Sequence, residues 1–156
     1  MCIRDRFSAA CQVGSISGLG TEAEVNALKS FGTNFGMTFQ LIDDAIDYSS
    51  NKKILGKNTG DDFKEGKITL PIILAYGRSN DKEKKFWERT ISDLNQNDGD
   101  FEMALEIINK YQCIEDTLTR ANHFSNVAVD SVDIFKDNIY KEKLVSLVTK
   151  SVSRIY

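Results

Sequence analysis

Three carboxylates lie close together at the end of a long apolar segment and could bind a metal. Asp43, Asp44 and Asp47 directly follow a stretch rich in Phe, Leu and Ile. On a helix, residues four apart lie about 40° apart around the axis, so Asp43 and Asp47 share a face with Asp44 beside them. Such carboxylates repel one another unless a cation lies between them, and Mg²⁺ prefers this kind of oxygen ligand. The spacing predicts a magnesium site or, as the alternative, a solvated acidic face.

A polar segment with several glycines, residues 49–66, follows these carboxylates and is the one long loop that we expect. Lys57 and Lys64 lie within it, and Lys67 follows it. Glycines let the backbone approach an anion closely, and lysines supply point charges for phosphate. The segment is not a P-loop, because it lacks the GxxxxGK[ST] pattern. Alone it would be a polar connector in which acidic residues pair with the lysines. After three carboxylates, it predicts a magnesium–diphosphate site.

The elements that must position these residues are helices. A single proline and long apolar periodicity predict an all-α chain. A capping box formed by Thr21 and Glu24 predicts the start of a long helix that runs to about Tyr48. Gly32 and Gly36, one turn apart on this helix, predict a close contact with a neighbouring helix. We expect the other helices at 7–17, 69–76, 81–93, 101–135 with a break near 111–113, and 141–155.

The composition excludes several classes of function. The net charge of −3 provides no basic surface for nucleic acid. No apolar run approaches the ~20 residues of a transmembrane helix. The three cysteines show no CxxC spacing, so they indicate neither a disulfide framework nor a zinc site and favour a reducing, cytoplasmic compartment. His123 is the only histidine and is expected to pack rather than to catalyse.

The two motifs together resemble those of the trans-polyprenyl diphosphate synthases, which join isoprenyl units head to tail. Residues 36–48 are similar to the family's second aspartate-rich motif with its leading Phe-Gln, and residues 56–71 are similar to the loop that follows it. The loop is more similar to the long-chain, octaprenyl-type synthases that make quinone side chains than to the farnesyl type. The resemblance covers nearly the whole chain from Phe7. It implies an antiparallel all-α bundle of the isoprenoid synthase type around a central cavity.

The resemblance implies roles for the charged residues of both motifs. Asp43, Asp44 and Asp47 are expected to hold Mg²⁺ on an allylic diphosphate. Lys57 and Lys67 match family lysines that bind this diphosphate and assist catalysis. Magnesium and lysines would stabilise the charge of the departing diphosphate.

The resemblance also implies a reaction between two prenyl substrates. The allylic C–O bond ionises, the double bond of isopentenyl diphosphate attacks, and a proton is lost. Gln40 matches a catalytic residue near the reacting carbons, and Phe39 matches a substrate-binding aromatic of the cavity wall. No protein nucleophile is needed, in agreement with the lack of a nucleophile motif in the sequence.

The chain departs from the family pattern at its N-terminal end. It lacks the family's first DDxxD motif and the Lys-Thr pair expected just before Phe7. Residues 1–6 do not resemble family sequence and are interpreted as an artefactual leader. We interpret residues 7–156 as the C-terminal part of a single synthase domain, truncated at the N-terminus. This part is expected to be inactive alone and to expose apolar surface where missing helices would pack.

Three hypotheses about function follow. The first is a Mg²⁺-dependent prenyltransferase of isoprenoid biosynthesis, which the family resemblance implies to be a homodimer or a heteromer. The second is a non-catalytic partner subunit of a heteromeric prenyl synthase, although the intact aspartates and lysines speak against a loss of function. The third is an unrelated helical interaction module, which would bind neither magnesium nor diphosphate.

Overall fold

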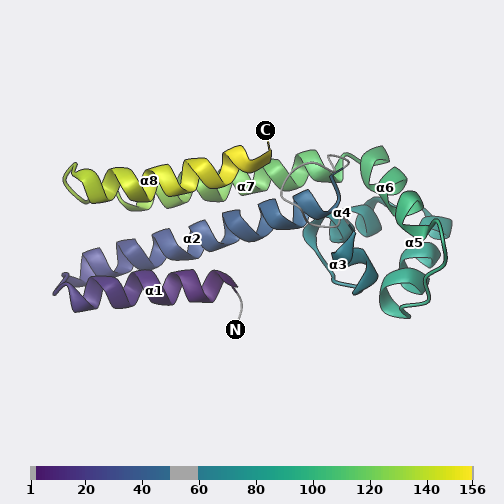
Figure 1. The fold of residues 1–156 in the computed structure, drawn as a ribbon, viewed down its shortest axis with the longest axis horizontal. Coiled ribbons are helices and arrows are strands. Elements are labelled where there is room, and N and C mark those ends of the chain that lie inside the picture. The colour runs from purple at the N-terminus through teal and green to yellow at the C-terminus, as the bar shows by residue number, and fades with distance from the viewer. Residues whose placement is uncertain (1–2, 50–59, 156) are drawn as a thin grey trace. The chain divides into compact units, whose positions relative to one another are not determined.

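The computed structural model describes residues 3–49 and 60–155, and all the regular elements within these ranges are helical (Figure 1). The all-α prediction is therefore confirmed for the described part of the chain. None of the described helices is both long enough and apolar enough to cross a membrane.

The chain divides into two compact units. Unit 1 comprises Met1–Ile42 and Thr119–Tyr156, and unit 2 comprises Asp43–Leu118. Helices α2 (Glu22–Asp47) and α7 (Cys113–Ser131) contribute residues to both units. The predicted acidic motif lies on the part of α2 that belongs to unit 2.

Unit 1 is built from long helices around a small apolar core. Besides its parts of α2 and α7, it contains α1 (Ile3–Ser17), α8 (Ile139–Val152) and the 3₁₀-helix η2 (Ser153–Ile155). Within this unit α1 runs alongside α2, and α8 runs alongside α7 (Figure 1). Phe31 and Phe35 of α2 form a buried cluster with Ala128, Val132 and Val148.

Two glycines of α2 permit the close contact with α1. A Cβ atom on Gly32 would lie 2.5 Å from the carbonyl oxygen of Phe7, and one on Gly36 would lie 2.6 Å from the Cα of Arg4. No larger residue fits at either position without moving the α1 backbone. The contact predicted from the spacing of these glycines is therefore confirmed, and it fixes α1 beside the helix that carries the acidic motif.

The start of α2 also agrees with the sequence prediction. The Thr21 N–H donates to Glu24 Oε2 at 2.7 Å, and the Glu24 N–H donates to Thr21 Oγ1 at 3.4 Å. These reciprocal bonds form the capping box, which satisfies two N–H groups that the first turn of a helix leaves unpaired.

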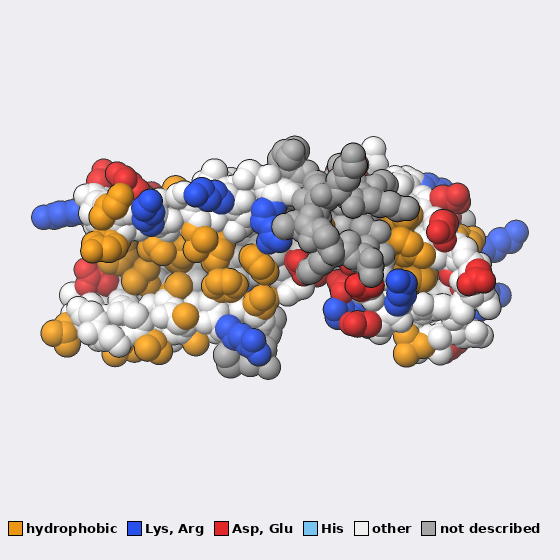
Figure 2. Space-filling model, viewed as in Figure 1, with side chains coloured by type: hydrophobic (Ala, Val, Ile, Leu, Met, Phe, Trp, Pro, Cys, Tyr) orange, Lys and Arg blue, Asp and Glu red, His pale blue; other side chains and the backbone are white. Residues whose placement is uncertain are grey.

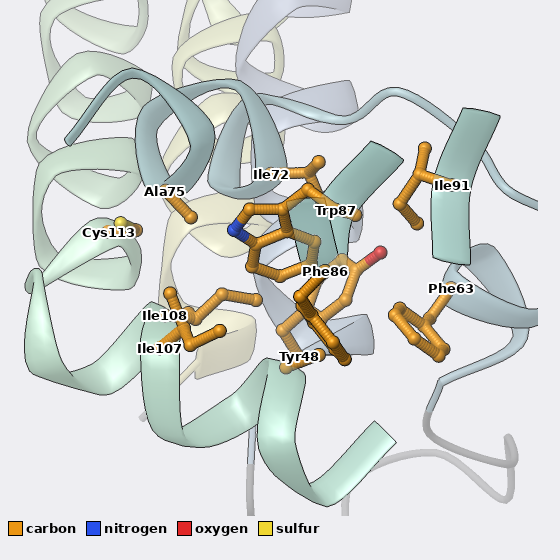
Figure 3. Packing of buried hydrophobic residues seen from close by; sticks show 11 residues of the cluster. Tyr48, Phe63, Ile72, Ala75, Phe86, Trp87, Ile91, Ile107, Ile108 and Cys113 are labelled. Carbon is orange, nitrogen blue, oxygen red and sulfur yellow. The ribbon is translucent and has the colours of Figure 1, made fainter. Parts of the chain in front are cut away.

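Unit 2 consists of shorter helices around Trp87. They are α3 (Asp61–Lys64), α4 (Leu70–Arg78), α5 (Asp81–Trp87), the π-helix η1 (Glu88–Ser92) and α6 (Asp100–Lys110). Trp87 is 1% exposed, and its cluster includes Ile72 from α4 and Ile108 from α6 (Figure 3). The indole N–H donates to Ser79 Oγ at 3.1 Å, so its one polar group is satisfied.

The predicted long helix at 101–135 is two helices, α6 and α7. They are separated near Tyr111, as the expected break at 111–113 allowed, and Gln112 takes a positive φ of 51° there. The second helix ends at Ser131, before the expected 135, because the chain turns there with i→i+3 bonds such as Val132 N–H to Val129 O.

Two helices begin two or more residues earlier than predicted. Helix α1 begins at Ile3 rather than Phe7, since its first turn packs on Gly36. Helix α8 begins at Ile139, two residues early, because the Asn138 side chain caps it by accepting two backbone N–H bonds.

Candidate functional site

The acidic end of α2 is attached to the short helix α3, which lies inside the segment predicted to be a loop. Asp47 Oδ2 accepts the backbone N–H of Asp62 at 3.0 Å, and the Asp47 carbonyl accepts the N–H of Gly60 at 3.0 Å. The carboxylate thereby satisfies an N–H of the first turn of α3, where negative charge is favourable. The bond from the Asp62 N–H to Asp47 is the physical reason that the chain forms α3. It also places the end of the predicted loop segment beside the acidic motif.

The solvated-face alternative does not fit the burial of the carboxylates. Asp44 is 6% exposed, and Asp43 and Asp47 are half-buried. Burial raises the pKa of Asp47 despite its bond from the Asp62 N–H, and the nearby carboxylates of Asp62 and Asp61 raise it further. A cation at this position would relieve both the burial and the repulsion. Burial and the neighbouring carboxylates therefore disfavour the charged form of Asp47.

The donor atoms suit a metal that is shared with an anionic ligand. Mg²⁺ takes one or two protein carboxylates together with water and phosphate oxygens. Across residues 3–49 and 60–155, no group of three Asp, Glu, His or Cys side chains lies close enough together to hold a metal by itself. The joint role of Asp43, Asp44 and Asp47 as metal ligands therefore stays a prediction.

Lys67 is held beside this acidic end by Asp62. Its Nζ donates to Asp62 Oδ1 at 2.6 Å and lies 3.1 Å from Glu65 Oε2. The hydrogen bonds to Asp62 and Glu65 raise the pKa of Lys67 above its usual value. Because the Asp62 backbone is itself bound to Asp47, Asp62 joins a predicted metal ligand to a predicted phosphate-binding lysine.

Asp62 and Tyr48 lie near the acidic end of α2, and neither was among the predicted site residues. The polar-connector alternative predicted that acidic residues of the loop pair with lysines, and the pair of Asp62 with Lys67 agrees with that alternative. A carboxylate five residues before a lysine is a weak signal, since α3 is what brings the two together.

Tyr48 fixes the end of α2 in the core of unit 2. Its ring is 1% exposed and lies among the cluster residues in Figure 3. Burial raises the pKa of the phenol, and the carboxylates of Asp47, Asp62 and Asp44 raise it further. Tyr48 Oη and the neighbouring Thr69 Oγ1 are both buried. An aromatic anchor next to Asp47 keeps the acidic motif in a fixed orientation.

The predicted substrate-contacting residues Phe39 and Gln40 lie in unit 1, not in unit 2 with the acidic motif. Phe39 and Gln40 are half-buried and lie on the part of α2 that belongs to unit 1. The ring of Phe39 lies 5.8 Å from that of Phe7 and 5.4 Å from the Arg154 guanidinium. Lys57 lies outside the described residues.

Unit 1 exposes apolar side chains along its helices, as a band in Figure 2 shows. Leu19 is 93% exposed and Tyr140 is 79% exposed. A groove of about 190 Å³ lies between α2 and the start of α8; its lining includes Leu28, Phe135 and Leu144. The expected exposure of apolar surface is thus observed in unit 1.

Sequence comparisons identify relatives over most of the chain. The profile of the family described as "Polyprenyl synthetase" matches residues 5–108. The octaprenyl diphosphate synthase of Haemophilus influenzae is 37% identical over 150 residues, which are 96% of this chain and 45% of that protein. The octaprenyl diphosphate synthase of Escherichia coli is 33% identical over 148 residues, 95% of this chain and 46% of that protein. The chain therefore spans less than half the length of these curated relatives.

Solved structures show the same fold. A decaprenyl diphosphate synthase from Rhodobacter capsulatus matches with a TM-score of 0.90 and 36% identity, covering 99% of this chain and 49% of that one. A polyprenyl synthase from Caulobacter crescentus, complexed with calcium and isoprenyl diphosphate, matches with a TM-score of 0.85 and 41% identity, covering 94% and 45%. The predicted all-α isoprenoid synthase fold is thereby confirmed.

Proposed function

The chain belongs to the polyprenyl synthetase family, and we propose that it is the C-terminal part of a polyprenyl diphosphate synthase. The whole enzyme would condense isopentenyl diphosphate with an allylic diphosphate, for isoprenoid and quinone side-chain biosynthesis. The names of the relatives support the reaction class. The observation that carries the proposal is the hydrogen-bonded connection from Asp47 through Asp62 to Lys67, which places an anionic and a cationic group at one end of α2.

These residues would divide the work of ionising an allylic diphosphate. Asp43, Asp44 and Asp47 would hold Mg²⁺, which supplies neutralising charge to the leaving diphosphate when bound. Lys67 contributes a permanent positive charge, and Asp62 orients its ammonium group. Fixed charges of this kind stabilise a departing anion without the cost of reorganisation during the reaction. Lys57 would bind the same diphosphate.

The residues of unit 1 would contact the carbon skeleton instead. We propose that Phe39 forms part of the wall of the hydrocarbon cavity and that Gln40 lies near the reacting carbons. The half-buried state of both side chains supports this proposal, since a cavity wall needs one accessible face.

Calorimetry tests the proposed site. A bisphosphonate titrated in the presence of Mg²⁺ is expected to bind the wild-type chain, and Asp47→Asn is expected to weaken binding at least tenfold. Asp98→Asn, which removes an exposed carboxylate elsewhere in unit 2, is the charge-matched control and should leave binding unchanged. Equal affinities of all three proteins, or no magnesium-dependent binding, would exclude a metal–diphosphate site on these residues.

We also propose that the chain is inactive alone and works in the cytoplasm as part of a homodimer or a heteromer. Its share of the relatives' length, about 45%, supports the incomplete active site. The alternative is a non-catalytic partner subunit of a heteromeric synthase. Activity assays with and without the N-terminal half of the Haemophilus influenzae synthase distinguish the two, because only an incomplete catalytic half is restored by that segment. Sedimentation of the same samples measures the oligomeric state.

A further inference from the structure

A row of four phenylalanine rings in unit 1 ends at an arginine. The ring centroids of Phe31 and Phe35 are 6.0 Å apart, those of Phe35 and Phe7 are 4.8 Å apart, and those of Phe7 and Phe39 are 5.8 Å apart. The guanidinium carbon of Arg154 lies 5.4 Å from the centroid of Phe39. The row thus leads from the fully buried Phe31 and Phe35 to the half-buried Phe39, which has an aromatic and a cationic neighbour.

The two neighbours of Phe39 act on it in different ways. Phe7 belongs to α1, whose distance from α2 is set by the glycine contact at Gly32. Arg154 belongs to η2, after the last long helix. A guanidinium is planar and weakly hydrated, so it stacks on an aromatic face and is attracted by the negative charge of that face. A half-buried ring with such a contact loses rotamer freedom that an unsupported ring would keep.

We propose that Arg154 is a positioning residue that holds the ring of Phe39 in place as a wall for the hydrocarbon chain of a prenyl diphosphate. This inference rests on the proposed function, which gives Phe39 a prenyl chain to contact. Arg154 acts through the ring and not on the diphosphate. Its effect therefore depends on the hydrocarbon part of the ligand and on the presence of the aromatic ring.

Two ligands that share a diphosphate but differ in hydrocarbon separate these roles. Farnesyl diphosphate and inorganic diphosphate are titrated with Mg²⁺ onto wild type, Arg154→Met and Lys150→Met. Lys150 is an exposed cation on α8 and is the charge-matched control. Arg154→Met is expected to weaken farnesyl diphosphate binding two- to fivefold and to leave inorganic diphosphate binding unchanged. Lys150→Met is expected to leave the binding of both ligands unchanged. Equal losses on both ligands would show a direct anion contact, and no loss on either would show no role; both results overturn the proposal.

A second variant tests whether the effect passes through the ring. In a Phe39→Leu background, Arg154→Met is expected to cause no further loss of farnesyl diphosphate binding. With Phe39 present, Arg154→Lys is expected to bind farnesyl diphosphate more tightly than Arg154→Met but less tightly than wild type. The reason is that an ammonium is attracted to the ring but does not stack on it. An undiminished effect of Arg154→Met without the ring would overturn the proposal.

Fluorine NMR distinguishes a failure of this inference from a failure of the proposed function. In protein labelled with 4-fluorophenylalanine, Arg154→Met is expected to shift the Phe39 resonance, which Phe39→Leu identifies, whereas Lys150→Met is not. If the wild type binds neither ligand, the proposed function and the hydrocarbon role both fall. The spectra then still decide whether Arg154 fixes the ring, and an unchanged Phe39 resonance would exclude it.

Discussion

Several ion pairs of unit 2 connect different helices, whereas Lys141 of unit 1 pairs with residues just before its own helix. Arg89 of η1 donates two hydrogen bonds, of 2.8 and 2.7 Å, to the Asp100 carboxylate at the start of α6. Lys110 of α6 lies 2.7 Å from Glu83 of α5. In unit 1, by contrast, Lys141 pairs with Asp133 and Asp137 in the adjacent turn at 3.6 and 3.1 Å. Unit 2 is therefore joined across its own helices by charged groups as well as by its aromatic core.

The buried apolar clusters of the two units also differ. Its buried cluster is smaller than that of unit 2, and Ile16, Leu19 and Tyr140 are exposed. Apolar side chains in a continuous band mark a surface that packs against something further. Unit 2 also exposes apolar side chains, among them Ile68 and Leu94, so the two units differ mainly in the size of their buried clusters.

The largest effect is expected from a substitution that removes the centre of the core of unit 2. Trp87→Ala deletes a fully buried indole and leaves a cavity, so it should lower the free energy of unfolding by about 3–5 kcal/mol. Chemical denaturation followed by circular dichroism measures this loss. Hydrogen exchange should show the loss in α4 to α6 and much less in α1. Equal loss in both units would contradict the contrast between them.

A smaller effect is expected from the contact of α1 with α2 in unit 1. Gly36→Val places a side chain 2.6 Å from the Arg4 Cα and should destabilise this contact by about 1–3 kcal/mol, because the α1 backbone must shift. Gly14→Ala is the control, since no atom lies within 4 Å of its added Cβ. It should be neutral or stabilising, as alanine favours a helix. Hydrogen exchange of α1 measures both changes, and unchanged protection in Gly36→Val would refute the close contact.

Two helix caps offer a matched comparison between the units. Asn80 caps α5 in unit 2, and Asn138 caps α8 in unit 1, each by accepting two backbone N–H bonds. Replacement by Ala should cost about 1 kcal/mol at either position. If unit 1 unfolds separately at lower denaturant, Asn138→Ala should move only the first of two transitions and Asn80→Ala only the second. A single shared transition that both variants move would show that the units unfold together.

The smallest effect is a pH dependence in unit 2. The hydrogen bond from Lys110 lowers the pKa of Glu83 to about 2. Because the folded-state pKa is lower than the usual value of 4.5, this group stabilises the fold above that value. Its contribution is lost as the pH falls from there through about 2. Glu83→Gln should reduce this acid sensitivity, and the exposed control Glu102→Gln should not; unfolding curves across this range test the difference.

Local features of the chain could be predicted from the sequence. The capping box at Thr21 and Glu24 and the main helices depend on neighbours only a few residues apart, so their patterns are visible in the sequence. The glycine pair at 32 and 36 also indicated a close helix contact, although it did not identify α1 as the partner. The family resemblance, carried by the aspartates and the lysine-rich segment, is confirmed.

The arrangement of the site depended on contacts that no local pattern shows. Asp47 binds the backbone of Asp62, fifteen residues later, and this contact creates α3 within a segment that reads as a loop. Arg154 meets Phe39 only because α8 brings the end of the chain back along unit 1. Helix signals act over a few residues, whereas these contacts depend on how helices pack. The sequence by itself therefore determined most of the helices and the family, and the tertiary structure decided which charged and aromatic groups meet.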